Sequence, residues 1–241
     1  MELASSPTLA TSTVPLTPPF VQIKSLSTHT CALTPTGVLY TWGNGDKHRL
    51  GHSPSNGTAK VCLPTRVDWF VTNNVKVIDV ACGLGHTICL DDGGRVYTWG
   101  NGGNGRLGHG DARDKQLPSV VLGLCETSLE RGWEGRVRRV AAGASHSVAV
   151  GEREVYCWGK GTQGQLGLGD EVDCCVPGIM PTIVDENDEK VFVVGASGGE
   201  TGTTLFARLC LRDSTGATVL ARLYWLAPFA PTAAPFVHTC V

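Results

Sequence analysis

The sequence predicts an all-β fold, a β-propeller made of four-stranded blades. One pattern occurs three times, with Trp42, Trp99 and Trp158 at equivalent places 57 and 59 residues apart. Each copy offers four short runs rich in Val, Ile, Thr, Tyr and Trp, and Gly or Pro ends each run before two helical turns could form. Because a sheet of four short strands cannot bury both faces alone, repeats of this size stack around an axis as propeller blades.

The copies share both an upstream and a downstream signature. The clearest tryptophan segment is RVYTWGNGGNGRLGHGD, from Arg95 to Asp111, and its counterparts begin at Gly37 and Glu154. A histidine precedes each tryptophan by 13, 13 and 12 residues, at His29, His86 and His146. Downstream, a Pro-x-x-Val piece recurs as Pro64 to Val67, Pro118 to Val121 and Pro181 to Val184. The sequence therefore predicts one further strand after each tryptophan turn.

The blades follow in chain order after a leader, residues 1–19, which is rich in Ser, Thr and Pro and is expected to be disordered. Blade one is expected at about 20–67, blade two at about 75–121 and blade three at about 137–184. Blade one is the weakest copy, because Leu26 occupies the place of Gly83 and Gly143 in the later copies. A partial fourth unit begins near residue 190 and completes a propeller region that we place at 20–197.

Residues 198–241 diverge from the repeat. Gly198 stands where a histidine is due, and the place due a tryptophan holds Cys210 and Leu211. We hypothesise that this tail is non-native sequence from a truncated or frame-shifted reading. Absence of a downstream W-G-x-G-x-x-G-x-L-G in every frame of the encoding DNA would contradict that idea. A membrane span at 219–237 is disfavoured by Arg222 and by three prolines.

The ordered pieces HT-x-x-L, G-x-V-Y-x-W-G-x-G-x-x-G-x-L-G-x-G-D and P-x-x-V resemble the regulator-of-chromosome-condensation (RCC1-like) repeat family over roughly residues 20–197. The resemblance implies a propeller, seven-bladed in the family, of which this chain carries three recognisable blades and the start of a fourth. It also implies structural roles at the repeated positions, which are His29, Trp42, Gly43, His86, Trp99, Gly100, His146, Trp158 and Gly159.

The function that this reading favours is a non-enzymatic protein-binding scaffold in the cytoplasm or nucleus. The resemblance implies a sharper alternative, a guanine-nucleotide exchange factor, or a fragment of one, for a Ran-like small GTPase. Ubiquitin ligases of the family carry a separate large catalytic domain, and 241 residues leave no room for one. The partner is therefore expected to be another protein, with no small-molecule substrate and no membrane.

A third alternative is a chromatin-associated recognition module. The net charge of −2 argues against binding DNA mainly by phosphate neutralisation, but Arg131, Arg136, Arg138 and Arg139 cluster in the sequence. The long connection between blades two and three also carries Trp133, and such loops commonly meet partners. The candidate partner contacts are therefore Trp133, Arg136, Arg138 and Arg139. The alternatives are that the arginines belong to a solvated loop leading into a strand and that Trp133 folds back onto the blades.

Several motifs imitate catalytic or cofactor sites. Gly100-x-Gly102-x-x-Gly105 satisfies a dinucleotide fingerprint, but no helix is expected behind it to hold a pyrophosphate. The run Gly195 to Gly199 spells a nucleophile elbow without the helix that such an elbow needs. The three repeated histidines could share a metal only if all pointed into the channel; we expect each ring to bond a backbone group of its own blade instead. No cofactor, metal or catalytic residue is predicted.

Ten cysteines occur without a C-x-x-C pair or a secretory leader. Cys82, Cys89 and Cys157 fall at strand positions where other copies have small or apolar residues. We therefore interpret them as core residues of a reducing compartment.

Overall fold

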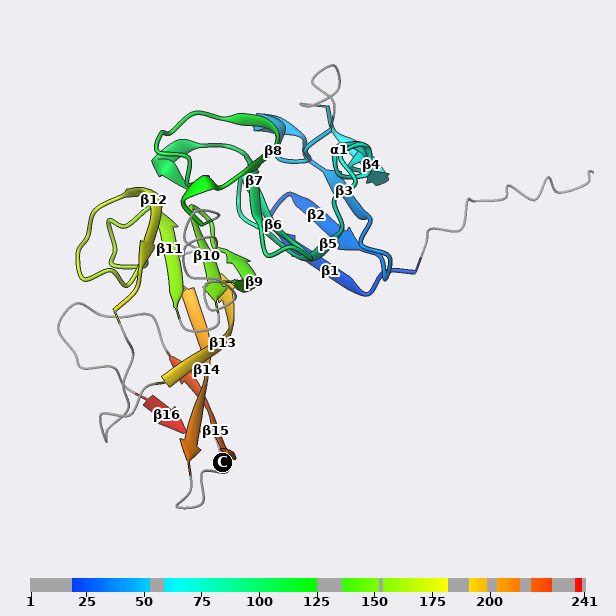
Figure 1. The fold of residues 1–241 in the computed structure, drawn as a ribbon. Helices are drawn as coiled ribbons and strands as arrows, with labels where there is room; N and C mark the ends of the chain where they lie inside the picture. Colours follow the sequence, from blue (N-terminus) through cyan, green and yellow to red (C-terminus); the bar gives the residue numbers. More distant parts are fainter. Residues whose placement is uncertain are drawn as a thin grey trace, which may run out of the picture.

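The computed structural model describes residues 19–52, 59–124, 136–151 and 154–181, and beyond them the strands at 191–198, 203–212, 218–226 and 237–239. These residues form four antiparallel sheets of four strands, which follow one another along an open arc (Figure 1). In every sheet the order of the strands in space is their order in the chain. The predicted all-β, incomplete propeller fold is confirmed.

The first two sheets are called blade one and blade two. Blade one consists of β1 (Gln22–Leu26), β2 (His29–Leu33), β3 (Leu39–Gly43) and β4 (Val61–Arg66). Blade two consists of β5 (Val77–Cys82), β6 (His86–Asp91), β7 (Val96–Gly100) and β8 (Lys115–Val120). Short 3-10 helices, η1 (Asp46–His48) and η2 (Gly103–Gly105), lie between the third and fourth strands.

Blade three consists of β9 (Val137–Ala142), β10 (His146–Gly151), β11 (Val155–Gly159) and β12 (Cys174–Ile179). The fourth sheet consists of β13 (Val191–Gly198), β14 (Thr203–Arg212), β15 (Thr218–Leu226) and β16 (Val237–Thr239). Its two middle strands have 10 and 9 residues, against 5 or 6 in the three blades before it. This difference in length falls where the sequence departs from the repeat.

The first strand of each sheet lies on the inner side of the arc. Strand β5 lies against β1 and β9, and β9 lies against β13 (Figure 1). The middle strands β6, β7, β10 and β11 are buried along their whole length because neighbouring blades cover both faces. Each fourth strand of blades one to three lies at an edge and carries a proline, Pro64, Pro118 or Pro177, whose missing N–H an edge strand tolerates.

One sequence assignment is wrong. The Pro-x-x-Val piece of blade three was expected at Pro181 to Val184, but the outer strand is β12, with Pro177 in the place of Pro64 and Pro118. Backbone pairing decides the register, because the Met180 N–H donates to the Val155 carbonyl as the Val121 N–H does to that of Val96. Pro181 follows the strand, and Val184 lies outside the described residues.

Two hydrophobic clusters lie between consecutive blades. The first surrounds Trp99 between blades one and two, and the second surrounds Trp158 between blades two and three. The short helix α1 (Asp68–Thr72) places buried Phe70 with its ring centroid 5.8 Å from that of Trp99. Leu124 is buried in the second cluster, three residues after Val121, as Phe70 is three residues after Val67. The connections between blades therefore help to fill the interfaces.

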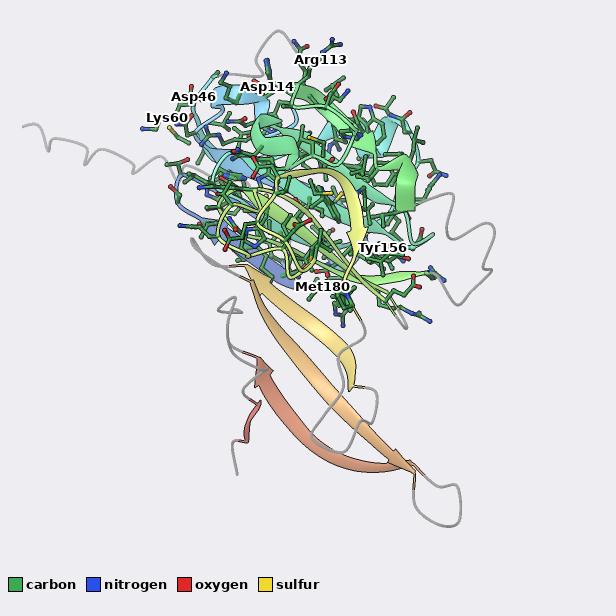
Figure 2. The ribbon with its side chains drawn as sticks, turned by 90° about the vertical axis from the view of Figure 1, so that its left-hand side faces the viewer. Asp46, Lys60, Arg113, Asp114, Tyr156 and Met180 are labelled. Atoms are coloured by element: carbon green, nitrogen blue, oxygen red, sulfur yellow. The ribbon has the colours of Figure 1, made fainter. Side chains whose placement is uncertain are left out.

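Polar contacts also join the outer loops. The Lys47 Nζ of η1 lies 3.3 Å from an Asp114 carboxylate oxygen in blade two, and Figure 2 shows Asp46, Arg113 and Asp114 at the same end of the molecule. The Asn104 amide of η2 donates to Asp173 of blade three at 2.8 Å. Each turn therefore rests on a loop of the next blade. None of the helices in the described ranges has the length and apolar character of a membrane span.

Candidate functional site

The repeated histidines His29, His86 and His146 begin β2, β6 and β10. All three side chains are buried. Each histidine pairs across its sheet with the glycine that follows the repeated tryptophan, which is Gly43, Gly100 or Gly159. The 13- or 12-residue spacing in the sequence is thus the length of one hairpin.

A chain of hydrogen bonds connects blade one to blade two. The Thr87 hydroxyl of β6 donates to the Arg49 carbonyl at 2.7 Å, and His29 Nε2 lies 3.0 Å from the same Thr87 oxygen. A carbonyl cannot donate, so the single hydroxyl proton of Thr87 is used in the bond to Arg49. The Thr87 oxygen must therefore accept the bond from the His29 Nε2–H. In the neutral form of this ring, the lone pair is therefore on Nδ1.

The same chain connects blade two to blade three. The Ser147 hydroxyl donates to the Arg106 carbonyl at 2.8 Å, and His86 Nε2 lies 2.9 Å from the Ser147 oxygen. By the same reasoning, the His86 Nε2–H donates to Ser147. The expectation that each ring bonds a backbone group of its own blade is wrong for His29 and His86, because both reach a hydroxyl of the next blade.

The repeated tryptophans lie at the same interfaces. The Trp99 indole is fully buried and donates from Nε1 to the Arg49 carbonyl at 3.0 Å, so this carbonyl accepts two bonds from blade two. Trp158 is also fully buried. Trp42 is only half-buried and stacks on Phe20, with ring centroids 6.4 Å apart, because in the described part of the chain no blade precedes blade one.

Sequence reasoning missed Arg49 and Arg106, each seven residues after a repeated tryptophan. The Arg49 guanidinium donates to the Leu84 carbonyl of blade two at 3.1 Å, and that of Arg106 donates to the Ala144 carbonyl of blade three at 3.3 Å. Copy three has Gln165 at this place. The signal that could have found them is the recurrence of arginine at the same place in two copies. The prediction for this turn rested only on its glycines.

The glycines after the tryptophans allow close backbone approach. Gly43, Gly100 and Gly159 have φ of 109°, 102° and 108°, in the left-handed region that favours glycine. A Cβ on Gly100 would lie 2.6 Å from the Gly85 carbonyl oxygen. The dinucleotide-like spacing therefore has a packing cause. Similarly, the nucleophile-elbow run stays in β13 through Gly198, where such an elbow needs a turn and a helix after its serine.

We expect Gly105→Ala to lower the free energy of unfolding by about 3 kcal/mol. Gly105 has φ of 73°, and a Cβ there would lie 2.5 Å from Cys175 Cα on β12 of blade three. Gly169→Ala is the matched control, because Gly169 has φ of 95° but nothing within 4 Å of its Cβ position. The control should cost only about 1 kcal/mol of backbone strain. Equal losses in urea unfolding would contradict a role for Gly105 between blades.

Burial favours the neutral form of His86 and His146. Burial lowers the pKa of His86 well below its ordinary value, and the Arg106 charge lowers it further. Burial lowers the pKa of His146 to about 4. In the unfolded chain these two histidines take up protons near pH 6.5, whereas in the folded chain they do so only at lower pH. Their contribution to the free energy of unfolding is therefore complete above about pH 6.5 and is lost as the pH falls toward 4.

We therefore expect the free energy of unfolding to fall by about 1.4 kcal/mol per pH unit for each histidine between pH 6.5 and 4.5. Urea unfolding at several pH values measures this slope. Carboxylates titrate in the same region, so the test is the difference between the wild type and His86→Gln/His146→Gln, where an amide replaces the titrating ring. Identical slopes in the two proteins would contradict the assignment to these histidines.

The candidate partner contacts are only partly brought together. Arg138 and Arg139 are exposed on the inner strand β9, whereas Arg136 is partly buried where a Cβ on Gly94 of blade two would meet its side chain. Arg131 and Trp133 lie outside the described residues.

Among the residues described, one group of three potential metal ligands is close together, and it is His29, Cys31 and Cys82 rather than the three repeated histidines.

Four-stranded sheets in series, joined by repeated side chains from blade to blade, define a β-propeller repeat protein. The chain belongs to the Regulator of chromosome condensation (RCC1) repeat family, whose model matches residues 36–90, 93–150 and 154–206. A second model of the same repeat matches residues 77–106. The resemblance inferred from the tryptophan segments is thus confirmed.

The relatives extend well beyond the matched region. Ultraviolet-B receptor UVR8 of Arabidopsis thaliana is 38% identical over 152 residues, 62% of this chain and 31% of UVR8. Human E3 ubiquitin-protein ligase HERC2 is 34% identical over 166 residues, 68% of this chain but 3% of HERC2. The chain thus spans about a third or less of these relatives, and in HERC2 the match covers only the repeat region.

Solved structures agree on the fold. Prp20p from Saccharomyces cerevisiae superimposes with a TM-score of 0.63 and 26% identity, over 82% of this chain and 45% of Prp20p. The same yeast protein in complex with Kap60 gives a TM-score of 0.61 and 26% identity, over 76% of this chain and 41% of that one.

Proposed function

We propose that this chain is a non-enzymatic protein-binding scaffold that presents the loops of its blades to another protein. The observation that carries the proposal is that the repeated polar side chains form hydrogen bonds between neighbouring blades. His29, His86 and Arg106 are buried and bonded to the next blade, so these hydrogen bonds join neighbouring blades. Exposed side chains of the loops are then free to differ from blade to blade and to define a partner.

The likeness to Prp20p supports a narrower version, an exchange factor, or a fragment of one, for a Ran-like small GTPase. Prp20p was described with its binding to Gsp1p and to histones, and in a second structure with Kap60. Exchange requires only a surface that favours the nucleotide-free state of the GTPase, with no covalent chemistry. A nuclear or cytoplasmic location follows from this proposal.

The test measures binding and exchange separately. The purified chain is titrated with a Ran-type GTPase, with Kap60 and with histones, and release of fluorescent GDP from the GTPase is followed in parallel. Saturable binding without faster release supports the scaffold. Faster release supports the exchange factor. Failure to bind any of the three at micromolar concentration would reject both versions in this form.

Chromatin association through the arginine cluster is a separate candidate, favoured by exposed Arg138 and Arg139 on β9. Binding of DNA by these side chains should weaken steeply with salt and show no base preference. Arg138→Glu/Arg139→Glu should then abolish it, whereas Arg113→Glu, at an exposed side chain of blade two, should have a smaller effect. Binding that is insensitive to salt would count against this candidate.

A further inference from the structure

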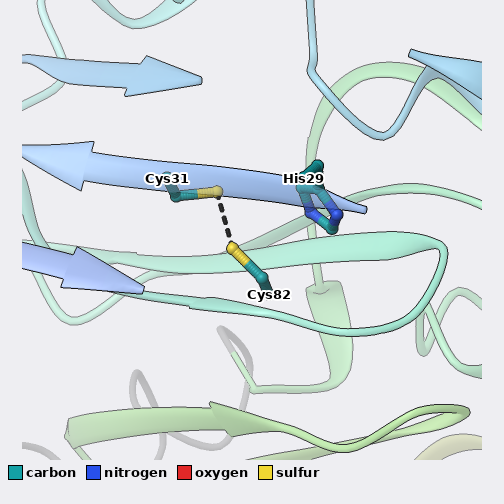
Figure 3. Close-up of side chains that lie close together, drawn as sticks. All are labelled: His29, Cys31 and Cys82. Atoms are coloured by element: carbon teal, nitrogen blue, oxygen red, sulfur yellow. Dashed lines mark hydrogen bonds between the residues drawn. The ribbon is translucent and has the colours of Figure 1, made fainter. Parts of the chain in front are cut away.

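Two cysteines and a histidine meet at the interface between blades one and two. Cys31 of β2 and Cys82 of β5 have their sulfur atoms 2.9 Å apart, within hydrogen-bond distance, although 51 residues separate them in the chain. A ring nitrogen of His29 lies within 4.8 Å of both sulfurs (Figure 3). Cys31 is fully buried, and Cys82 and His29 are 5% and 1% exposed.

Packing does not require sulfur at these places. Ile88 of β6 and Ala142 of β9 occupy the equivalent positions at the next interface, where both belong to the hydrophobic cluster around Trp158. An apolar pair of this kind thus fills the same space between blades two and three. The sulfur pair at the first interface therefore calls for a chemical explanation.

The geometry suits a disulfide better than a metal. In a tetrahedral zinc site with bonds of about 2.3 Å, two thiolates lie about 3.8 Å apart. The sulfurs here are closer than that, at 2.9 Å. A disulfide needs a further approach of only about 0.9 Å, to about 2.05 Å.

We propose that Cys31 and Cys82 are a redox site, which hydrogen peroxide converts to a disulfide between blades one and two. Cys82 gives its proton to the His29 Nδ1 lone pair, and its thiolate attacks one peroxide oxygen and breaks the O–O bond. The hydroxide that leaves takes the proton back from the ring. Cys31 then attacks the sulfenic sulfur of Cys82, forming the S–S bond and breaking the S–O bond, and the proton of the Cys31 thiol joins the departing hydroxide to give the second water. Two thiols and one peroxide give one disulfide and two waters.

The surroundings assign the roles of the two thiols. Burial raises the pKa of Cys82, but the adjacent Cys31 thiol and His29 ring lower it by more, so it lies below its ordinary value. Burial raises the pKa of Cys31 well above its ordinary value. Cys82 is thus the thiol that ionises and attacks first, and Cys31 resolves the intermediate. His29 Nδ1 has no hydrogen-bond partner in the described part of the chain, which leaves it available as the base.

Peptide mapping of the peroxide-treated full chain tests the proposal directly. Digestion with trypsin places Cys31 in the peptide 25–47 and Cys82 in the peptide 77–95. We expect these two peptides to appear cross-linked, lighter by two hydrogen atoms, and to separate on reduction. Oxidation should also raise the thermal unfolding midpoint by about 5–10 °C.

Variants separate this pair from the other cysteines. Cys89 lies in the same tryptic peptide as Cys82, so Cys89→Ala should keep the cross-link and Cys82→Ala should abolish it. His29→Gln should shift the pH at which oxidation is half-maximal upward. Free Cys31 and Cys82 after treatment that oxidises exposed Cys62, or stoichiometric zinc that protects both thiols, would overturn the proposal. The map of the wild-type chain decides even if a variant fails to fold.

Discussion

Trp99→Ala should lower the free energy of unfolding by about 4 kcal/mol. The indole is fully buried between blades one and two, where its ring centroid lies 5.8 Å from that of Phe70. Truncation removes this packing and also the hydrogen bond from Nε1 to the Arg49 carbonyl. A Cβ on Gly51 would lie 2.7 Å from the indole nitrogen, so the turn of blade one rests directly on the ring. The loss should therefore open the whole first interface.

Trp42→Ala is the matched control for this effect. Trp42 occupies the same place in blade one but is only half-buried, against Phe20. We expect its truncation to cost about 1–2 kcal/mol, since the indole is already partly in water. Urea unfolding followed by far-ultraviolet circular dichroism compares the two variants without depending on tryptophan fluorescence. Equal losses would show that Trp99 has no special role between blades.

The strands and their order could be predicted because one blade is a local structure. The hairpin from His86 to Gly100 is formed by one continuous stretch of sequence. The same pattern recurs around Trp42 and Trp158, which identifies a sheet in each copy. The same logic failed for the outer strand of blade three. There Met180 stands three residues after Pro177, where the other copies have Val67 and Val121, so a chance Pro-x-x-Val at Pro181 matched the pattern better.

The contacts between blades could not be predicted from the sequence pattern. Nothing near His29 in the chain indicates that its partner is Thr87, because the partner is set by how one sheet stacks on the next. The pairing of Cys31 with Cys82 was missed for the same reason, since each cysteine alone fits a core position. A comparison of equivalent positions across all copies, rather than along one copy, would have drawn attention to both pairs.

The inner strands contain a further contact of this kind, at Asp79. Its carboxylate is buried and accepts from Gln22 Nε2 of β1 at 2.7 Å and from the Val140 N–H of β9 at 3.0 Å. It also accepts from the Val80 N–H at 3.0 Å. One side chain therefore ties together the inner strands of blades one, two and three.

We expect Asp79→Ala to lower the free energy of unfolding by about 4 kcal/mol, because it leaves a buried donor of blade three and a partly buried donor of blade one without an acceptor. Asp79→Asn should cost less, about 1–2 kcal/mol, since one amide oxygen still accepts and a rotated Gln22 amide could accept from the new N–H. Asp68→Ala is the control: Asp68 forms an exposed ion pair with Arg66, and its loss should cost below about 1 kcal/mol. Urea unfolding of the three variants measures the order of these losses in the free energy of unfolding. If Asp79→Ala were no more harmful than Asp68→Ala, the blades would be held by their apolar clusters alone.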